Sequence, residues 1–419
     1  MLRCPCTCIL AVILSLGLCM GAGCAKRHQQ IPAARHDGYM LVPPKTAEGL
    51  AAGLSPEGQE LSSWLDLRQP LLHSLSYLQS KPQHELAAAR EDAHLTWGRL
   101  TSSALKLLWL LPRLDKEPEL LAKEFEWYRL GPEPIFTGYY APVIEASLAP
   151  DEVYRHPLYA VPPDLKRINL GSLRPELRGQ VHYYRVEGEN IRPYHSRREI
   201  ELGGVLAGRN LEIAWAKDPL DLFYLHVQGS GYLRLPDGSL VKAQFGGKNG
   251  RPFKSISQVL LEKGHLRQNE LSRARIAAYL DANPHTKHEL LAENESFIFF
   301  QLGQGQPQGA MQRPLTALVS LAADPRLMPL GSIMAFSTVL PPDRPGGTPR
   351  RVAGLGLAQD TGSAIKGNRF DLYCGTGKER EHLACHIKTE AAVYLLLCRE
   401  EHLALAPSVI QPVRDEENR

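Results

Sequence analysis

Two aspartates lie eleven positions apart in the stretch VAGLGLAQDTGSAIKGNRFDLYCGTG, which covers residues 352–377. Asp360 ends an apolar run, and Asp371 stands between Phe370 and Leu372. A carboxylate on an apolar strand is unfavourable unless it is hydrogen-bonded, paired or protonated. Two such carboxyl groups on either side of one short loop therefore predict an acid/base site with tuned pKa values.

A structural role is the alternative for each aspartate of this region. Asp360 precedes Thr361 and Gly362, which is typical of a loop where the carboxylate accepts backbone N–H bonds. Asp324 precedes proline in AADPRLMPLGS and most simply begins a turn, so we assign it a structural role. Asp371 fits such an explanation less well, because aspartate is disfavoured in the middle of a strand.

The elements that must position these aspartates are short strands. Apolar runs broken by glycines predict two buried strands joined by a tight loop at 361–368. Further upstream, four short apolar runs bracketed by turn residues also predict strands. These runs are Val181–Val186, Ile213–Trp215, Phe223–Val227 and Tyr232–Leu235.

Helical patterns flank the strand-rich region. Leucine and aromatic spacing predicts helices from Leu54 to Leu130, divided into three by Pro82 and Pro112. A further helix is expected over Ser255–Ala282, and a short closing helix over Glu390–Cys398.

The N-terminus predicts export. Arg3 precedes the apolar run Ile9–Leu18, and small residues lead into Cys24, which is the pattern of a secretory signal peptide. The ending Gly-Ala-Gly-Cys resembles a bacterial lipobox, although Gly21 stands where such sequences prefer leucine. Cys24 is therefore the expected lipidated residue, followed by a basic, proline-containing tether. The net charge of +3, with both signs interspersed, does not indicate a nucleic-acid partner.

Three other motifs do not point to a disulfide framework, a metal site or a protease. Three cysteines remain beyond the signal region (Cys374, Cys385 and Cys398), an odd number that allows at most one disulfide. His382, Cys385 and His386 have metal-like spacing but lack a nearby second pair, so we predict no metal site. Asp360-Thr361-Gly362 matches the aspartic-protease triplet, but the second such triplet that a single-chain protease needs is absent.

Aromatic and polar side chains alternate at Thr137-Gly138-Tyr139-Tyr140. Flat aromatic rings suit the C–H faces of sugars, while hydroxyl and amide groups can bind sugar hydroxyls. Gln228-Gly229-Ser230-Gly231 lacks the glycine spacing of a serine-nucleophile turn, and a turn that presents polar groups to a ligand is the better interpretation. Ordinary core packing is the alternative for any one of these aromatic residues.

Five segments, in this order, resemble the membrane-bound lytic murein transglycosylase A family: FTGYYAPVIEAS, HVQGSG, ENESFIFFQ, DPRLMPLGS and AQDTGSAIKGNRFDLYCGTG. The last segment, together with Asp324, is similar to the three-aspartate (3D) domain. The resemblance implies a mainly β fold with α-helices, in which a double-psi β-barrel with N-terminal helices is interrupted by an inserted second β-barrel domain, with a groove between them. The expected divisions are a signal peptide (1–23), a lipidated tether (24–46), a helical part of domain A (47–138), an inserted domain B (139–293), the C-terminal part of domain A (294–400) and a polar tail (401–419).

The resemblance also implies an activity. The family cleaves the MurNAc–GlcNAc β-1,4 bond of peptidoglycan without water and forms 1,6-anhydromuramic acid ends. On this basis Asp371 is the expected acid/base and Asp360 the supporting carboxylate. The expected substrate-binding residues are Thr137, Gly138, Tyr139, Tyr140, Gln228, Gly229, Ser230 and Lys366. The alternatives are a water-using glycoside hydrolase on the same barrel and an inactive peptidoglycan-binding lipoprotein.

The expected setting is the periplasm, with the lipid on Cys24 holding the protein at the outer membrane. The expected partners are peptidoglycan glycan strands and, in addition, other cell-wall enzymes. We expect no cofactor, because an acid/base carboxyl group and a hydroxyl of the substrate itself supply the chemistry.

Overall fold

The computed structural model describes residues 38–90, 92–177, 180–362 and 364–399. The expected signal peptide, Cys24, most of the tether and the tail 401–419 lie outside these residues. In the described part of the chain, no helix has the length and apolar character that crossing a bilayer requires.

The N-terminal part is helical. Its helices are α1 (Pro44–Ala52), α2 (Arg68–Gln79), α3 (Trp97–Leu114) and α4 (Leu120–Glu124), with 3-10 helices at Glu57–Gln59 and Trp64–Leu67. Thr96 begins α3 by accepting the N–H of Arg99 at 3.1 Å. The prediction that the helix breaks at Pro112 is wrong, because α3 continues to Leu114. Proline has no backbone N–H, so the hydrogen bond that it cannot donate is missing only in the last turn of this helix. The helical region also ends at Glu124, before the expected Leu130.

A nine-stranded sheet packs with these helices in the largest hydrophobic core. Its order is β1 (Gly38–Leu41), β2 (Phe125–Gly131), β18 (Ala392–Cys398), β14 (Ile333–Leu340), β15 (Arg350–Asp360), β13 (Ser320–Ala322), β16 (Arg369–Thr376), β3 (Ile135–Ala141) and β17 (Lys388–Glu390). Most pairs are antiparallel, but β13 runs parallel to β15 and β16 runs parallel to β3. Among the described strands no ladder joins β1 to β17, so no closed barrel is found in these pairings.

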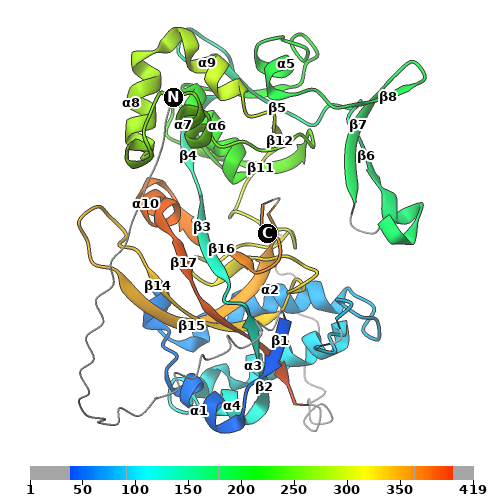
Figure 1. The fold of residues 1–419 in the computed structure, drawn as a ribbon, viewed down its shortest axis with the longest axis vertical. Coiled ribbons are helices and arrows are strands. Elements are labelled where there is room, and N and C mark those ends of the chain that lie inside the picture. Colours follow the sequence, from blue (N-terminus) through cyan, green and yellow to red (C-terminus); the bar gives the residue numbers. More distant parts are fainter. Residues whose placement is uncertain (1–37, 91, 178–179, 363, 400–419) are drawn as a thin grey trace, which may run out of the picture. The chain divides into compact units, whose positions relative to one another are not determined.

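The chain passes directly from β3 into a second sheet over Pro142 (Figure 1). This six-stranded sheet has the order β12 (Ile298–Gly303), β11 (Leu240–Lys248), β10 (Gly231–Arg234), β4 (Val143–Ser147), β9 (Glu212–Ala216) and β5 (His156–Tyr159). The helices between its strands are α5 (Arg197–Glu201), α6 (Pro219–Gln228), α7 (Ile256–Glu262), α8 (Arg273–Ala282) and α9 (Pro284–Ala292). A separate ribbon is formed by β6 (Lys166–Asn169), β7 (Val181–Glu187) and β8 (Asn190–Pro193) (Figure 1).

Three of the four short strands expected upstream are confirmed, as β7, β9 and β10. The strand expected at Phe223–Val227 is wrong, because these residues lie in α6. Asp218 caps this helix by accepting the N–H groups of Leu220 and Asp221, and Pro219 fills its first turn.

Two expected helices also differ. Glu390–Cys398 forms strands, with β18 inserted between β2 and β14. Its apolar run is buried on both faces, and periodicity alone cannot separate such a strand from a buried helix. The helix expected over Ser255–Ala282 is two helices, α7 and α8, and each begins at a serine cap, Ser255 or Ser272.

The architecture is thus a mixed, strand-rich α/β fold. One remaining helix, α10 (Lys378–His386), lies against β3 and β16. It carries the expected histidine pair, whose ring centroids are 4.1 Å apart. Among the described residues, no group of three or more ligating side chains could hold a metal ion, and the three cysteines there are free.

Candidate active site

Asp360 and Asp371 lie on the two strands that flank β13. Both pair with the same residue of that strand, Ala322. Residues that are directly opposite in a ladder present their side chains on the same face of the sheet. The two aspartates therefore share one face, with their Cα atoms about two strand spacings, or roughly 10 Å, apart.

Asp371 is held by the neighbouring strand. Thr137 of β3 lies directly opposite, and its hydroxyl donates to Oδ1 of Asp371 at 2.7 Å. Burial raises the pKa of Asp371 above its usual value, while the Thr137 hydrogen bond and the positive charge of Arg369 act in the other direction. The carboxyl group is therefore tuned toward the protonated form that a general acid needs.

Asp360 has more hydrogen-bond donors. Its Oδ1 accepts the N–H groups of Thr361 at 2.8 Å and Ala310 at 2.9 Å, and its Oδ2 accepts the Tyr139 hydroxyl at 2.8 Å. Burial nevertheless raises the pKa of Asp360 to about 6, and the nearby charge of Asp371 adds to this rise. Asp360 is thus a fixed carboxylate that changes charge close to neutral pH.

Both interpretations of Asp360 therefore have support. It accepts the Thr361 N–H of the following loop, as the structural interpretation expects. It also shares a face with Asp371 and has a raised pKa, as an acid/base site requires.

A tyrosine pair lies beside the two carboxyl groups. The rings of Tyr139 and Tyr373 have centroids 5.3 Å apart, and the Tyr373 hydroxyl bonds Thr376 Oγ1 at 2.9 Å. Burial, followed by the charge of Asp360 and the hydrogen bond to it, raises the pKa of Tyr139 well above its usual value. Tyr139 is therefore a neutral hydrogen-bond donor at this site.

Asp324 fixes the loop between the two strands. It is buried, and it accepts the Gly367 N–H at 3.0 Å as well as the backbone and guanidinium of Arg326 at 2.7–3.1 Å. Burial opposes ionisation, but the bonds from Arg326 and Gly367 together lower the pKa of Asp324 to about 2. These contacts agree with a structural role.

Besides Thr137 and Tyr139, the expected substrate-binding residues occupy several positions in the fold. A side chain at Gly138 would meet the Ala384 carbonyl of α10 at 2.9 Å. Tyr140 is buried and its hydroxyl accepts from Arg273 at 2.7 Å, while its N–H donates to Gln228 at 3.2 Å. Gly229 ends α6 at a φ of 80°, and Ser230 follows it in the turn before β10. Lys366 lies exposed in the loop 361–368.

Gln359 is a buried polar residue that was not predicted to belong to the site. Its buried amide accepts from Ser320 at 2.6 Å and donates to the Pro70 carbonyl at 2.8 Å and to Ser74 at 2.9 Å. These bonds hold β13, β15 and α2 together one residue before Asp360. A polar residue inside the apolar run 352–359 was the available signal.

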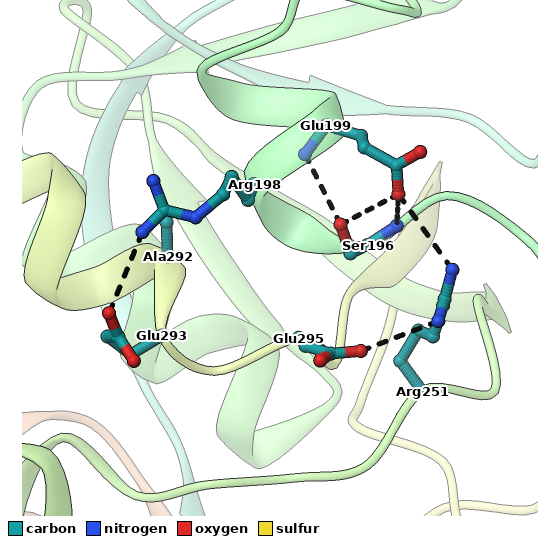
Figure 2. A pocket seen from close by; sticks show the side chains of 7 residues that line it. All are labelled: Ser196, Arg198, Glu199, Arg251, Ala292, Glu293 and Glu295. Atoms are coloured by element: carbon teal, nitrogen blue, oxygen red, sulfur yellow. Dashed lines mark hydrogen bonds and ion pairs between the residues drawn. The ribbon is translucent and has the colours of Figure 1, made fainter.

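A cavity of about 300 Å³ lies elsewhere, beside α5 and α9 (Figure 2). It is lined by Ser196, Arg198, Glu199, Arg251, Ala292, Glu293 and Glu295. Its arginines pair with its own glutamates, Arg198 with Glu293 at 3.7 Å and Arg251 with Glu295 at 3.5 Å. We interpret this cavity as an ion-pair network rather than part of the active site.

Two models of known families match different parts of the chain. Residues 135–301 match the MltA specific insert domain, and residues 319–397 match the 3D domain. The membrane-bound lytic murein transglycosylase A of Vibrio cholerae is 32% identical over 266 residues, which is 62% of this chain and 65% of that protein. The Escherichia coli protein of the same name is 31% identical over 59% of this chain and 61% of its own length. The chain thus spans a little under two thirds of these relatives.

Solved structures match a larger part of this chain than these relatives do. A membrane-bound lytic murein transglycosylase from Agrobacterium tumefaciens has a TM-score of 0.70 and 30% identity, covering 87% of this chain and 99% of that one. MltA from Neisseria gonorrhoeae has a TM-score of 0.67 and 28% identity, covering 86% and 93%. With both family domains matched and the Agrobacterium chain covered almost completely, this protein belongs to the membrane-bound lytic murein transglycosylase A family.

Proposed function

We propose that the protein is a peptidoglycan lytic transglycosylase. It cleaves the MurNAc–GlcNAc β-1,4 bond without water and leaves a 1,6-anhydromuramic acid end. The observation that carries this proposal is the pair Asp371 and Asp360, which share one face beside β13 and both have a raised pKa. The names of the relatives support it, and an E. coli MltA structure holds chitohexaose, a β-1,4-linked amino sugar.

Asp371 acts as the only acid/base. Its carboxyl group donates a proton to the glycosidic oxygen as the bond from that oxygen to C1 of MurNAc breaks. The C6 hydroxyl oxygen of the same MurNAc then bonds to C1, and its proton returns to Asp371. An ordinary glycosidase needs a second carboxyl group as nucleophile or base. Here the substrate supplies the nucleophile, with the large effective molarity of an intramolecular group.

Asp360 supports this reaction. The carboxylate of Asp360 lies on the same face of the sheet as Asp371. Its negative charge stabilises the positive charge that develops at C1 in the transition state. Tyr139 orients Asp360 and Thr137 orients Asp371. We propose that the exposed Lys366, together with Thr137 and Tyr139, lies along the bound glycan, and that Gly138, Tyr140, Gln228, Gly229 and Ser230 shape the wall behind it.

We also propose that each of the two sheets forms a β-barrel. The two parallel pairs, β13 with β15 and β16 with β3, support a double-psi β-barrel for the domain formed by 47–138 and 294–400. The six-stranded sheet, to which residues 294–400 contribute β12, would be the second barrel, and the glycan groove would lie between the two domains.

The setting is proposed from the N-terminal sequence and the names of the relatives. A lipid on Cys24 would hold the enzyme at the outer membrane, facing the periplasm. Its partners would be glycan strands and other cell-wall enzymes.

Mass spectrometry of muropeptides released from purified sacculi tests the activity. Products lighter by one water than those of a hydrolytic muramidase are expected. Asp371→Asn keeps the shape of the side chain but has no transferable proton, so turnover should fall about 10²–10⁴-fold with an unchanged melting temperature. Asp237→Asn, the same change in an exposed turn, is the matched control. Hydrated products would indicate a hydrolase, and full activity of folded Asp371→Asn would exclude Asp371 as the acid.

A further inference from the structure

Strand β3 presents the hydroxyl donors to the two aspartates on one face and packs against other elements with its second face. Thr137 and Tyr139 are two residues apart, so their side chains project from the same face, where each donates to an aspartate. Gly138 and Tyr140 project from the opposite face. The contacts of this second face therefore set the position of the two donors, because both faces belong to one backbone.

Arg273, in the first turn of α8, binds the second face of β3 at Tyr140. Its Nη1 donates to the Tyr140 hydroxyl at 2.7 Å and lies 3.1 Å from Oε2 of Glu381 on α10. Its Nη2 donates to Oδ1 of Asp221 on α6 at 2.8 Å. The guanidinium carbon Cζ lies 4.2 Å from the centroid of the Tyr224 ring. One side chain of α8 thus joins α6, α10 and β3.

These contacts are largely shielded from water. Tyr140 is 3% exposed, and the side chains of Arg273 and Glu381 are 22% and 20% exposed. Burial raises the pKa of Tyr140 well above its usual value, so its hydroxyl stays neutral and accepts from the guanidinium. A planar guanidinium with fixed N–H donors holds its partners in one geometry, and hydrogen bonds from a charged group are the stronger ones. The Tyr140 N–H adds a bond to Gln228 Oε1 at the end of α6, at 3.2 Å.

The same contacts join the two matched family domains. Arg273 and Asp221 lie in residues 135–301, which match the MltA specific insert domain, and this range includes β3. Glu381 lies in residues 319–397, which match the 3D domain and contain both aspartates of the site. Its helix, α10, packs against β3 and β16. Arg273 therefore links the insert domain to the part of the 3D domain that lies beside the acid/base residue.

We propose that Arg273 is a positioning residue for transglycosylation, which acts through Tyr140 on the hydroxyl groups of Thr137 and Tyr139. This inference rests on the proposed function and adds a residue of the insert domain to the reaction. By fixing β3 against α6 and α10, Arg273 keeps both hydroxyls at hydrogen-bond distance from the two aspartates. A displacement of about 1 Å near a reacting group can lower turnover about 10²-fold, so a loosened β3 should affect kcat more than glycan binding.

Arg273→Gln and Tyr140→Phe test the proposal, because they remove opposite sides of the same hydrogen bond. With release of anhydro-muropeptides from sacculi as the assay, kcat should fall about tenfold in both variants and KM should change by less than about twofold. The alkaline limb of the kcat/KM profile should also move to higher pH in both, because a displaced Thr137 hydroxyl stabilises the carboxylate of Asp371 less well.

A matched control and a double variant separate positioning from stability. Arg275→Gln changes an exposed arginine of the same helix, which pairs with Glu270, and should leave kcat and the alkaline limb unchanged. Arg273→Lys keeps the charge but lacks the planar fork that binds several partners, so its kcat should lie between those of the wild type and Arg273→Gln. Adding Arg273→Gln to Thr137→Val should move the limb no further than Thr137→Val alone, because both changes act on one hydroxyl.

The outcomes distinguish a positioning role from a structural one. A lowered melting temperature with an unshifted limb in Arg273→Gln and Tyr140→Phe would overturn the proposal, as would additive shifts in the double variant. If Arg273→Gln does not fold, Tyr140→Phe decides the question, because it keeps the buried ring and removes only the hydroxyl. A failure of the proposed function would instead be seen as the lack of anhydro products from the unmodified protein.

Discussion

Thr137 and Asp371 lie directly opposite each other on parallel strands, and the threonine hydroxyl donates to the carboxylate at 2.7 Å. Thr137 belongs to β3, the strand that continues into the six-stranded sheet over Pro142. The hydrogen-bond donor to the proposed acid/base residue therefore comes from the segment that joins the two sheets.

Thr137→Val removes this donor and keeps the side-chain size. The hydrogen bond favours the charged carboxylate, so its loss should raise the pKa of Asp371. A general acid with a higher pKa stays protonated to higher pH, and the alkaline limb of the kcat/KM profile should move up by about one pH unit. Thr137→Ser retains the hydroxyl and should keep the wild-type limb. An unshifted limb in Thr137→Val would show that this bond does not tune the acid.

Asp360 should make the stability of the protein depend on pH. Its pKa is about 6 in the folded protein against an ordinary value of 3.8, so between these values the folded state binds more protons than the unfolded state. Relative to Asp360→Asn, which does not titrate, the wild type should lose about 2 kcal/mol of unfolding free energy as the pH rises from about 4 to about 7. Urea unfolding of both proteins at several pH values measures this difference. A constant difference across the range would mean that the pKa is not raised.

Asp324→Asn should act on stability rather than on the chemical step. The change removes a buried carboxylate that binds Arg326 and the Gly367 N–H, at a cost of about 1–2 kcal/mol near neutral pH. Because the folded-state pKa is lowered to about 2, this contribution should disappear as the pH falls from about 4 to about 2. Asp343→Asn, which breaks the exposed pair with Arg350, is the control and should change stability by less than about 0.5 kcal/mol. Lost turnover without lost stability would assign Asp324 to the chemistry instead.

Cys24→Ser should release the protein from membranes into the soluble periplasmic fraction. The proposed lipid on Cys24 is the expected attachment to the membrane. Fractionation of cells that express each protein, with a high-salt wash, measures the effect. Sedimentation of Cys24→Ser with membranes after that wash would contradict lipid anchoring.

Local sequence signals predicted the strands around Asp360 and Asp371 well. The apolar runs around Asp360 and Asp371 form β15 and β16, as expected, and Asp324 makes the contacts of a structural residue. These predictions rest on residues that are close in the sequence. The strand that separates the two aspartates, β13, is only three residues long and comes from residues 320–322, so no local pattern could place it there.

The errors have a common cause. Phe223–Val227 and Glu390–Cys398 are mostly apolar with no clear polar face, so their periodicity could not distinguish a strand from a helix. For the first, the Asp218-Pro219 helix start was a signal that could have decided the matter. For the second, the strand pairs with β2 and β14, and those partners are far away in the sequence.

The position of β18 also has a consequence for how the protein folds. This strand is the last in the described chain, yet it lies between β2 and β14 in the interior of the nine-stranded sheet. During synthesis the N-terminal helices and β2 are made long before the strand that must join them to β14. The sheet therefore cannot be completed until almost all of the described chain has been made, and its assembly depends on contacts of high sequence separation, which form slowly. A chain that ends before Ala392 would leave β2 and β14 with open edges, and we expect such a fragment to aggregate rather than fold.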